Sequence, residues 1–327
     1  MLVTQQPRAD IGAQLRRVIK AILVDAHRLV TTEDTAESTR VHGARTRIKR
    51  IRALVALLRA DLGHTSFRAE ARALRDAARA LGPLRDSVAR LEAYDELSAH
   101  GAPGFPDEWR EVLTRERNRA LHQEITARIL SQTAVRLAAA QARVESWPSP
   151  THETESLAHG FLRNYARARR AFRSAKRNPT PEAMHALRRR TKRYQYHLRF
   201  LEPVGDRQMR ARCHRVEVLS ELLGKHHDLV LLSSALADES CGLKKLALRG
   251  LRRALERRER KLRRHALSLA RRVYRKQPRQ FARRLQRLLR RWHVSATQSP
   301  KQGPRELLGM PASLPVSSST ICALSLH

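Results

Sequence analysis

Apolar residues recur at three- and four-residue spacing along most of this chain. After His42, for example, the side chains at positions 48, 51, 54, 55 and 58 are apolar, and an α-helix brings these positions to one side. Alternating apolar and polar residues, the pattern typical of half-buried strands, are hard to find. The sequence therefore predicts an all-α fold built from amphipathic helices.

Three segments interrupt the helical pattern. "HGAPGFPDEW" at 100–109 contains Gly and Pro residues that predict a turn. "SWPSPTHETES" at 146–156 has the composition of a linker, and the C-terminal segment has that of a flexible tail. We therefore expect one helical domain over residues 1–293, divided near the linker, and a flexible tail at 294–327.

Two motifs occur twice in the chain. The basic cluster that follows His42 recurs after His185, 143 residues later. The motifs "LGPLRD" and "LGKHHD" place Asp86 and Asp228 142 residues apart. Two motif pairs with nearly one spacing indicate an internal duplication. We predict two homologous helical halves packed about a pseudo-twofold axis, 10–146 and 156–293.

The repeated cluster is predicted to form one side of a helix in each copy. At 100° per residue, the first copy places four residues within an arc of about 80°: His42, Arg45, Lys49 and Arg52. The second copy repeats the arrangement with His185, Arg188, Lys192 and Arg199, opposite Leu187, Tyr194, Leu198 and Leu201. Gln195 replaces the arginine found at Arg52. Few acidic residues lie four positions from these cations, which favours an anion-binding face over an ordinary solvated one.

The histidines of the two clusters have two interpretations. Each of His42 and His185, considered alone, is best interpreted as an incidental or structural histidine. Because the two occupy equivalent positions among arginines, the pair is better interpreted as hydrogen-bond donors to phosphate. Neighbouring cations should disfavour their imidazolium forms until a polyanion binds. Arg47 and Arg190 project instead toward the predicted core. A buried arginine needs a partner, so ion pairs with Asp86 and Asp228 are expected.

The composition indicates a polyanionic partner. The chain has 66 Lys and Arg against 31 Asp and Glu, a net charge of +35. Nucleic acid, polyphosphate and an anionic membrane surface are the candidates. Aromatic residues make up only 4% of the chain, so few side chains can stack on the bases of a single strand. A protein that binds a duplex through its phosphates needs no aromatic residues. No signal peptide or membrane span is predicted, and three widely spaced cysteines suit the cytoplasm.

Positive charge continues outside the two clusters. "FLRNYARARRAFRSAKR" places Arg163, Arg167 and Arg170 at helical spacing. Residues 249–291 are rich in Arg and carry an apolar stripe that indicates an amphipathic helix: Phe281, Leu285, Leu288, Leu289 and Trp292. This last region is equally well interpreted as a basic outer face without a specific ligand.

The sequence gives little support for catalysis. His226, His227 and Asp228 are adjacent, but consecutive helical residues diverge by about 100°, so they are not expected to hold one metal ion. No Gly-rich phosphate loop, HExxH or Gly-x-Ser-x-Gly motif occurs. We therefore expect a binding protein that is not an enzyme and has no cofactor or metal. A metal-dependent phosphohydrolase is the weaker alternative.

The duplicated motifs resemble those of a known family. "VHGARTRIKRIRALVALLR" at 41–59 and "MHALRRRTKRYQYHLRFL" at 184–201 resemble the signature of the CHAD family, the conserved-histidine α-helical domain. "LGPLRD" and "LGKHHD" match its later element, and the resemblance covers about residues 10–293. The acidic ExExK strand of the triphosphate-hydrolysing domain found in some relatives is absent from the sequence, so a stand-alone binding module is expected.

The resemblance implies two helical bundles around a basic central cavity that binds inorganic polyphosphate. With the expected cytoplasmic localisation, it suggests association with polyphosphate granules. The net charge leaves nucleic acid as a competing partner and nonspecific nucleic-acid binding as the alternative function. The oligomeric state is left open. Arg85 and Lys225 match the family pattern less firmly than the other residues. The residues expected to bind polyphosphate are His42, Arg45, Lys49, Arg50, Arg52, His185, Arg188, Arg189, Lys192, Arg193, Arg199, Arg85, Lys225, Arg163, Arg167 and Arg170.

Overall fold

The computed structural model describes residues 11–99, 106–147, 153–238 and 245–298. Helices are the regular elements of these residues, and no strand occurs among them, which confirms the predicted all-α fold. The elements are α1 Ile11–Thr31, α2 Glu37–Val55, α3 Gly63–Ala80, α4 Gly82–Ala99, α5 Asp107–Ala120, α6 Gln123–Glu145, α7 Glu153–Arg177, α8 Pro181–Leu201, the 3-10 helix η1 Glu202–Val204, α9 Arg207–Asp238, α10 Lys245–Val273 and α11 Pro278–Gln298.

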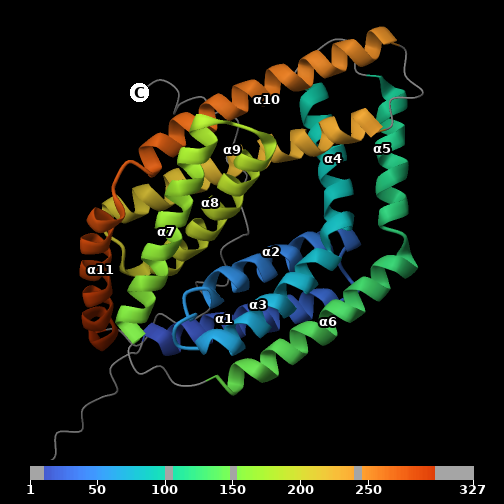
Figure 1. The fold of residues 1–327 in the computed structure, drawn as a ribbon. Coiled ribbons are helices and arrows are strands. Elements are labelled where there is room, and N and C mark those ends of the chain that lie inside the picture. The colour runs from blue at the N-terminus through green and yellow to red at the C-terminus, as the bar shows by residue number, and fades with distance from the viewer. Residues whose placement is uncertain (1–10, 100–105, 148–152, 239–244, 299–327) are drawn as a thin grey trace, which may run out of the picture.

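The helices form two groups (Figure 1). In the first group, α1 packs on α2 and α6, α3 packs on the same two helices, and α4 and α5 form a pair that extends from them. In the second group, α8 packs between α7 and α9, while α10 lies along α9 and α11 packs on α7. The groups meet where α2 contacts α8 and where α4 contacts α9.

One hydrophobic core runs through both groups. It extends without a break from Ile11 in α1 to Leu289 in α11. The residues predicted to face the core on α2, just after it and on α8 do so: Ile48, Ile51, Leu54, Val55, Leu58, Leu187, Tyr194, Leu198 and Leu201 are all buried. The two groups are therefore one packed body. Their origin by duplication stays a prediction.

Two residues bring the groups into close contact near the C-terminal end of α2. Gly160 lies in α7 beside Leu57, and a Cβ atom at Gly160 would lie 3.0 Å from the Leu57 carbonyl oxygen. His197 of α8 is fully buried, and its Nε2 lies 2.7 Å from the Ala53 carbonyl oxygen. Because burial lowers the pKa of His197 to about 3, this histidine is neutral and donates Nε2–H to that carbonyl.

Local sequence signals fix the start of α8. Thr180 is the N-cap, and its hydroxyl oxygen accepts a hydrogen bond of 3.2 Å from the backbone N–H of Ala183. Pro181 follows at the first helical position, where its missing N–H and fixed φ cost nothing, and Glu182 adds an acidic residue in the first turn. This cap determines where the basic cluster of α8 begins.

The predicted turn at 100–109 and linker at 146–156 lie partly outside the described residues. The helix α11 continues to Gln298, beyond the expected domain boundary at residue 293, and the rest of the predicted tail is also outside them. Among the helices of the described segments, none has a stretch apolar and long enough to span a bilayer.

Candidate functional site

A pocket of about 140 Å³ lies between α2, α4, α8 and α9, and we call it the basic pocket. It occupies the region where the two helix groups meet. Its cations come from α2, α4 and α8, so both groups contribute positive charge. The lining residues are His42, Arg45, Thr46, Lys49, Arg85, Asp86, Ala89, Arg188, Lys192, Tyr196, His227 and Asp228.

The helix α2 directs three predicted residues into the basic pocket. His42, Arg45 and Lys49 line it, while Ile48 is buried on the other side of the helix. Arg45 is held in place because its Nη1 donates to the Ala78 carbonyl oxygen at 2.8 Å and its Nη2 lies 3.7 Å from Asp86 Oδ1. The amphipathic pattern of α2 thus brings three of the four residues of its predicted basic face to the basic pocket, whereas Arg52 does not line it.

The helix α8 contributes the cations of the opposite wall. Arg188 and Lys192 lie one turn apart and line the basic pocket, followed by Tyr196. The Lys192 ammonium lies 5.4 Å from the centre of the Tyr196 ring. His185, one turn before Arg188, contacts His227 of α9 with 3.4 Å between their Nδ1 atoms.

The duplicated LG motifs supply residues from α4 and α9. Arg85 lines the basic pocket, and its Nη2 donates to Glu92 Oε2 at 2.8 Å. Asp86 pairs with Arg45, and Asp228 lies in the wall formed by α9. Burial raises the pKa of Asp228, although Arg188 and Arg85 act in the opposite direction. The pocket thus holds carboxyl groups among a larger number of cations.

The two lysines of the basic pocket are strongly perturbed. Burial, and then repulsion by Arg45 and Arg188, lowers the pKa of Lys49 to about 7. Burial, followed by repulsion from Arg188 and Arg199, lowers the pKa of Lys192 to about 8. Both shifts mean that the pocket opposes the charging of its own lysines when no anion is bound.

The histidines respond to the same environment. Burial and nearby cations lower the pKa of His42 and of His185, in the direction expected from the neighbouring arginines, with burial as the larger cause. Burial and Arg188 lower the pKa of His227 to about 3. In the contact between His185 and His227, one Nδ1–H therefore donates to the unprotonated Nδ1 of the other ring.

Six other predicted anion ligands form a separate group between α2, α7 and α8, together with Arg190, which is not a predicted ligand. We call it the α7–α8 arginine cluster: Arg52, Arg163, Arg167, Arg170, Arg189, Arg190 and Arg193. Burial, and then repulsion from Arg190 and Arg52, lowers the pKa of Arg193 to about 10. Arg163 also donates to the Ala56 carbonyl oxygen at 3.3 Å. None of these residues lines the basic pocket.

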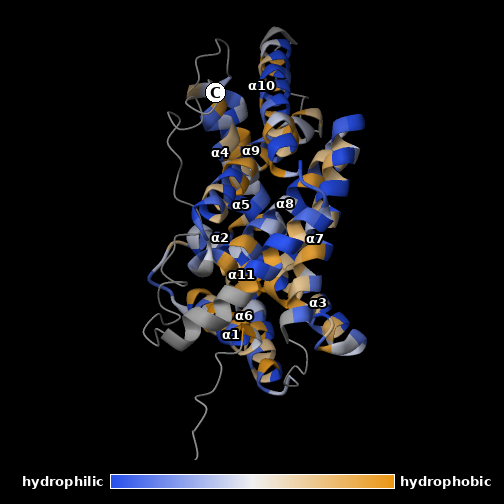
Figure 2. Cartoon of the chain, turned by 90° about the vertical axis from the view of Figure 1, so that its left-hand side faces the viewer, coloured by the Kyte–Doolittle hydropathy of each residue, from blue (hydrophilic) through white to orange (hydrophobic). Residues whose placement is uncertain are grey.

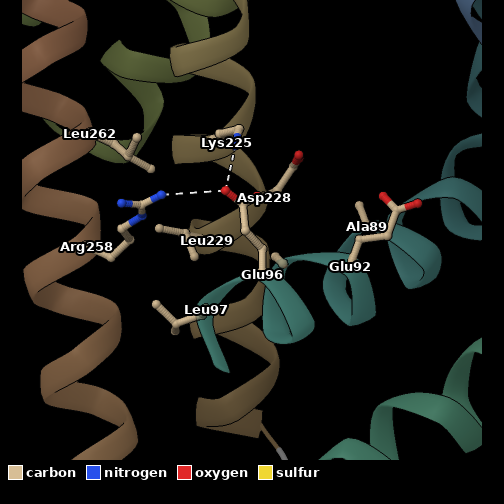
Figure 3. Close-up of a pocket in the computed structure, with 10 residues that line it drawn as sticks. Ala89, Glu92, Glu96, Leu97, Lys225, Asp228, Leu229, Arg258 and Leu262 are labelled. Atoms are coloured by element: carbon tan, nitrogen blue, oxygen red, sulfur yellow. Dashed lines mark hydrogen bonds and ion pairs between the residues drawn. The ribbon is translucent and has the colours of Figure 1, made fainter. Parts of the chain in front are cut away.

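Three further predicted ligands lie elsewhere. Arg199 forms an ion pair with Glu217 of α9, and Arg50 lies near Tyr196 and Arg199. Lys225 lines a different pocket, of about 80 Å³, between α4, α9 and α10, where its ammonium is 2.5 Å from Glu96 (Figure 3).

The ion pairs expected for Arg47 and Arg190 are wrong. Arg47 Nε donates to Asp25 Oδ2 at 2.6 Å, because α1 packs on this side of α2, and Asp86 pairs with Arg45 instead. Arg190 lies among arginines of the α7–α8 arginine cluster, whereas Asp228 faces the basic pocket. The periodic pattern identified the side of each helix correctly but did not identify the neighbouring helix.

Several pocket residues were not predicted as anion ligands. Thr46, Tyr196 and His227 line the basic pocket, and Asp86 and Asp228 do so as well. The equivalent positions of the two aspartates were a signal, because Asp86 belongs to the same motif as Arg85. Nothing in the sequence distinguishes His227 from His226, which is directed instead to Glu259 of α10 with 3.5 Å between Nε2 and Oε1.

The described part of the chain has no group of three or more His, Cys, Asp or Glu side chains arranged to hold a metal ion. His226 and His227 face different helices, as the divergence of consecutive helical residues predicts. The guanidinium, ammonium and imidazole groups that line the basic pocket can donate several hydrogen bonds to an anion.

Comparison with known proteins finds a matching family model and a similar fold. A family model described as the CHAD domain matches residues 13–237. The fold is similar to the crystal structure of the CHAD domain from the plant Ricinus communis, with a TM-score of 0.53 and 18% identity, over 80% of this chain and 92% of that one. A comparison with curated proteins finds no match. The chain belongs to the CHAD domain family.

Proposed function

We propose that this protein binds inorganic polyphosphate in the basic pocket. The observation that carries the proposal is the convergence of Arg45, Lys49, Arg85, Arg188 and Lys192 on one cavity from both helix groups. Phosphate oxygens accept charge-assisted hydrogen bonds from guanidinium and ammonium groups, and arginine binds them bidentately. Membership of the CHAD family supports the same ligand.

The electrostatic state of the empty pocket supports an anionic ligand. Lys49 has a pKa lowered to about 7 by burial and by surrounding cations. A phosphate chain that enters the pocket supplies the missing negative charge, so it raises the pKa of Lys49 and holds it protonated. The same effect acts on Lys192, whose pKa is lowered to about 8 in the empty protein.

The pocket offers little for recognition of bases. Apart from its histidines, Tyr196 is the aromatic residue among its lining, and Lys192 lies against that ring. A nucleic-acid strand gains much of its binding energy in single-stranded sites from base stacking. An anion with repeating phosphates and no bases fits the lining better.

We infer further that the protein acts by binding and not by catalysis, and that it associates with polyphosphate granules in the cytoplasm. Incubation of the pure protein with polyphosphate and Mg²⁺ should release no phosphate above the level of a buffer blank. Turnover that survives further purification, and that is lost in pocket variants, would establish an enzyme instead.

The test of binding uses a pocket variant and a matched surface variant. Lys49→Gln with Arg188→Gln removes two pocket cations, and Arg128→Gln with Arg136→Gln removes two exposed cations from α6. A charged hydrogen bond is worth about 1.5–3 kcal/mol, so the pocket variant should lose at least about tenfold in polyphosphate affinity. The α6 variant should change by less than about twofold. Equal losses would mean general electrostatic attraction without a site.

A further inference from the structure

The helix α10 exposes positive charge along one side. Every exposed charged residue in its described part is Arg or Lys except Glu256. At 100° per residue, a set of arginines lies within an arc of about 80°. We call it the α10 stripe: Arg249, Arg253, Arg257, Arg260, Arg264 and Arg271.

The other side of α10 is fixed in the core. Leu251, Leu255 and Leu262 are 1%, 2% and 5% exposed, and Ala266 is fully buried. The helix packs on α9 and α7 and forms one long edge of the molecule (Figure 1). Many of its residues are hydrophilic (Figure 2). The stripe is therefore a straight row of cations on a rigid support.

None of the ion pairs among the described residues includes an arginine of the stripe, although the exposed Glu256 lies one turn from Arg253 and from Arg260. The ion pairs of α10 use residues on its flanks, Arg258 with Glu96 at 3.5 Å and Arg263 with Glu259 at 3.8 Å. Like charges three or four residues apart destabilise a helix. A bound polyanion removes this repulsion and gains the entropy of released counterions.

The residues beside the stripe exclude two kinds of partner. The described part of α10 exposes no apolar side chain that could enter a membrane. It also exposes no aromatic ring on which the bases of a single strand could stack. What remains is a surface for regularly spaced phosphates, which needs neither feature.

The length and shape of the stripe favour a double helix. From Arg249 to Arg271 it extends about 33 Å, close to one turn of a duplex at about 34–36 Å. A flexible phosphate chain loses conformational freedom when it is aligned along a straight helix. A duplex is already stiff, with a persistence length of about 50 nm and one charge per ~1.7 Å.

We propose that the α10 stripe is a second anion-binding surface that binds double-helical nucleic acid through its phosphates, without sequence preference. This surface is separate from the basic pocket, whose lining includes no residue of α10. The inference does not rest on polyphosphate binding.

The test compares two ligands and two variants. Arg253→Glu, Arg257→Glu and Arg264→Glu should weaken binding of a labelled random 20-base-pair DNA duplex by at least about tenfold, measured by fluorescence anisotropy. The negative slope of log K against the logarithm of the salt concentration should become smaller in magnitude by about 3. Binding of short tripolyphosphate should stay within about twofold. The variant Lys49→Gln with Arg188→Gln alters the pocket alone. It should therefore lose tripolyphosphate binding and keep its affinity for the duplex.

The triple Arg→Lys variant at the same positions controls for folding and should keep duplex affinity within about threefold, since lysine retains the charge. Circular dichroism should be unchanged for both triple variants. Unchanged duplex binding in the folded Arg→Glu variant would overturn the proposal. An equal loss of affinity for the duplex and for tripolyphosphate in that variant would overturn it as well. If the pocket variant still binds tripolyphosphate with unchanged affinity while the stripe variant loses affinity for DNA, the proposed function fails and this inference stands.

Discussion

Lys49 is the residue at which folding and ligand binding conflict most. Its ammonium lies among Arg45, Arg188 and Lys192 in a partly dehydrated pocket. A cation in such a position destabilises the empty protein, because burial and repulsion both disfavour its charge. The same cation is available to a bound phosphate.

We therefore expect Lys49→Met to act in opposite directions on stability and on binding. Methionine keeps the aliphatic length but removes the charge, so it should stabilise the empty protein by about 1–3 kcal/mol at pH 7. Polyphosphate affinity should fall at least about tenfold. Denaturant unfolding and direct binding measure the two effects. As a control, Ile48→Ala removes a neighbouring core side chain and should lower the free energy of unfolding by about 2–5 kcal/mol. If Lys49→Met also lowers the free energy of unfolding, the lysine has a structural role.

The lowered lysine pKa values predict a proton uptake on binding. Lys49 has a pKa of about 7 in the empty protein, below its ordinary value, so the unfolded chain binds more protons above pH 7 and stability should rise from pH 7 toward 10. A bound polyanion raises the pKa of Lys49, and affinity should therefore fall as pH rises above 7. Calorimetry at pH 7.5 in buffers of different ionisation enthalpy should detect the uptake. An absence of uptake in the wild type would contradict this prediction.

His42, which lines the basic pocket, and His185, which contacts the pocket residue His227, titrate in a lower range than the lysines. The pKa values of His42 and His185 are lowered in the empty protein, and a phosphate chain should raise them. His42→Ala and His185→Ala should therefore weaken polyphosphate binding more at pH 6 than at pH 8. Binding titrations at the two pH values measure this difference. If each variant loses the same factor at both, the histidines contribute shape and not charge.

At the scale of elements, α8 shows how a local signal positions a distant site. Thr180 caps the helix, and Arg188 and Lys192 follow two and three turns later in the basic pocket. Thr180→Ala should lower the free energy of unfolding by about 1 kcal/mol, because the Ala183 N–H loses its acceptor. Thr180→Ser should retain most of that stability. Polyphosphate affinity should be unchanged in both, and a loss of affinity with Ala alone would mean that the cap also orients the pocket residues.

The sequence predicts the helices and their faces well, because both depend on local periodicity. The buried positions from Ile48 to Leu58 follow from spacing, and so do the pocket positions of Arg45, Lys49, Arg188 and Lys192. The spacing also predicts Arg52 and Arg199 on the same faces, but neither lines the basic pocket. The ion-pair partners of individual charged residues cannot be predicted from local periodicity. Arg47 meets Asp25 and Lys225 meets Glu96 because α1 and α4 pack beside them, and this packing depends on contacts between segments far apart in the chain.

The candidate site is predicted in part for the same reason. His42, Arg45, Lys49, Arg188 and Lys192 lie together because each copy of the motif places its cations on one side of its own helix. The arginines at the neighbouring positions Arg189 and Arg193 lie about 100° away from these residues, and they join the α7–α8 arginine cluster. A single run of basic sequence thus supplies two surfaces, and only the packing of α7 on α8 separates them.

At the scale of the whole molecule, one continuous core holds together a chain with a net charge of +35. Repulsion among so many cations opposes the compact state, and it is concentrated in the basic pocket, the α7–α8 arginine cluster and the α10 stripe. Stability of the empty protein should therefore depend on the anions in solution more than on any single ion pair. The isolated surface pairs, such as Arg110 with Asp95, contribute little against this repulsion.

Raising NaCl from about 0.05 to 0.5 M should increase the melting temperature of the empty protein, because the added salt shortens the screening length from more than ~10 Å to a few ångström. Polyphosphate at about 100 times its Kd should add about 2.7 kcal/mol through mass action, measured by the same thermal melts. Lys49→Gln with Arg188→Gln should respond to NaCl as the wild type does, since most of its cations remain, but should lose the response to low polyphosphate concentrations. A melting temperature that falls with salt would mean that attractive ion pairs, such as those of Arg47 and Arg284, outweigh the repulsion between cations.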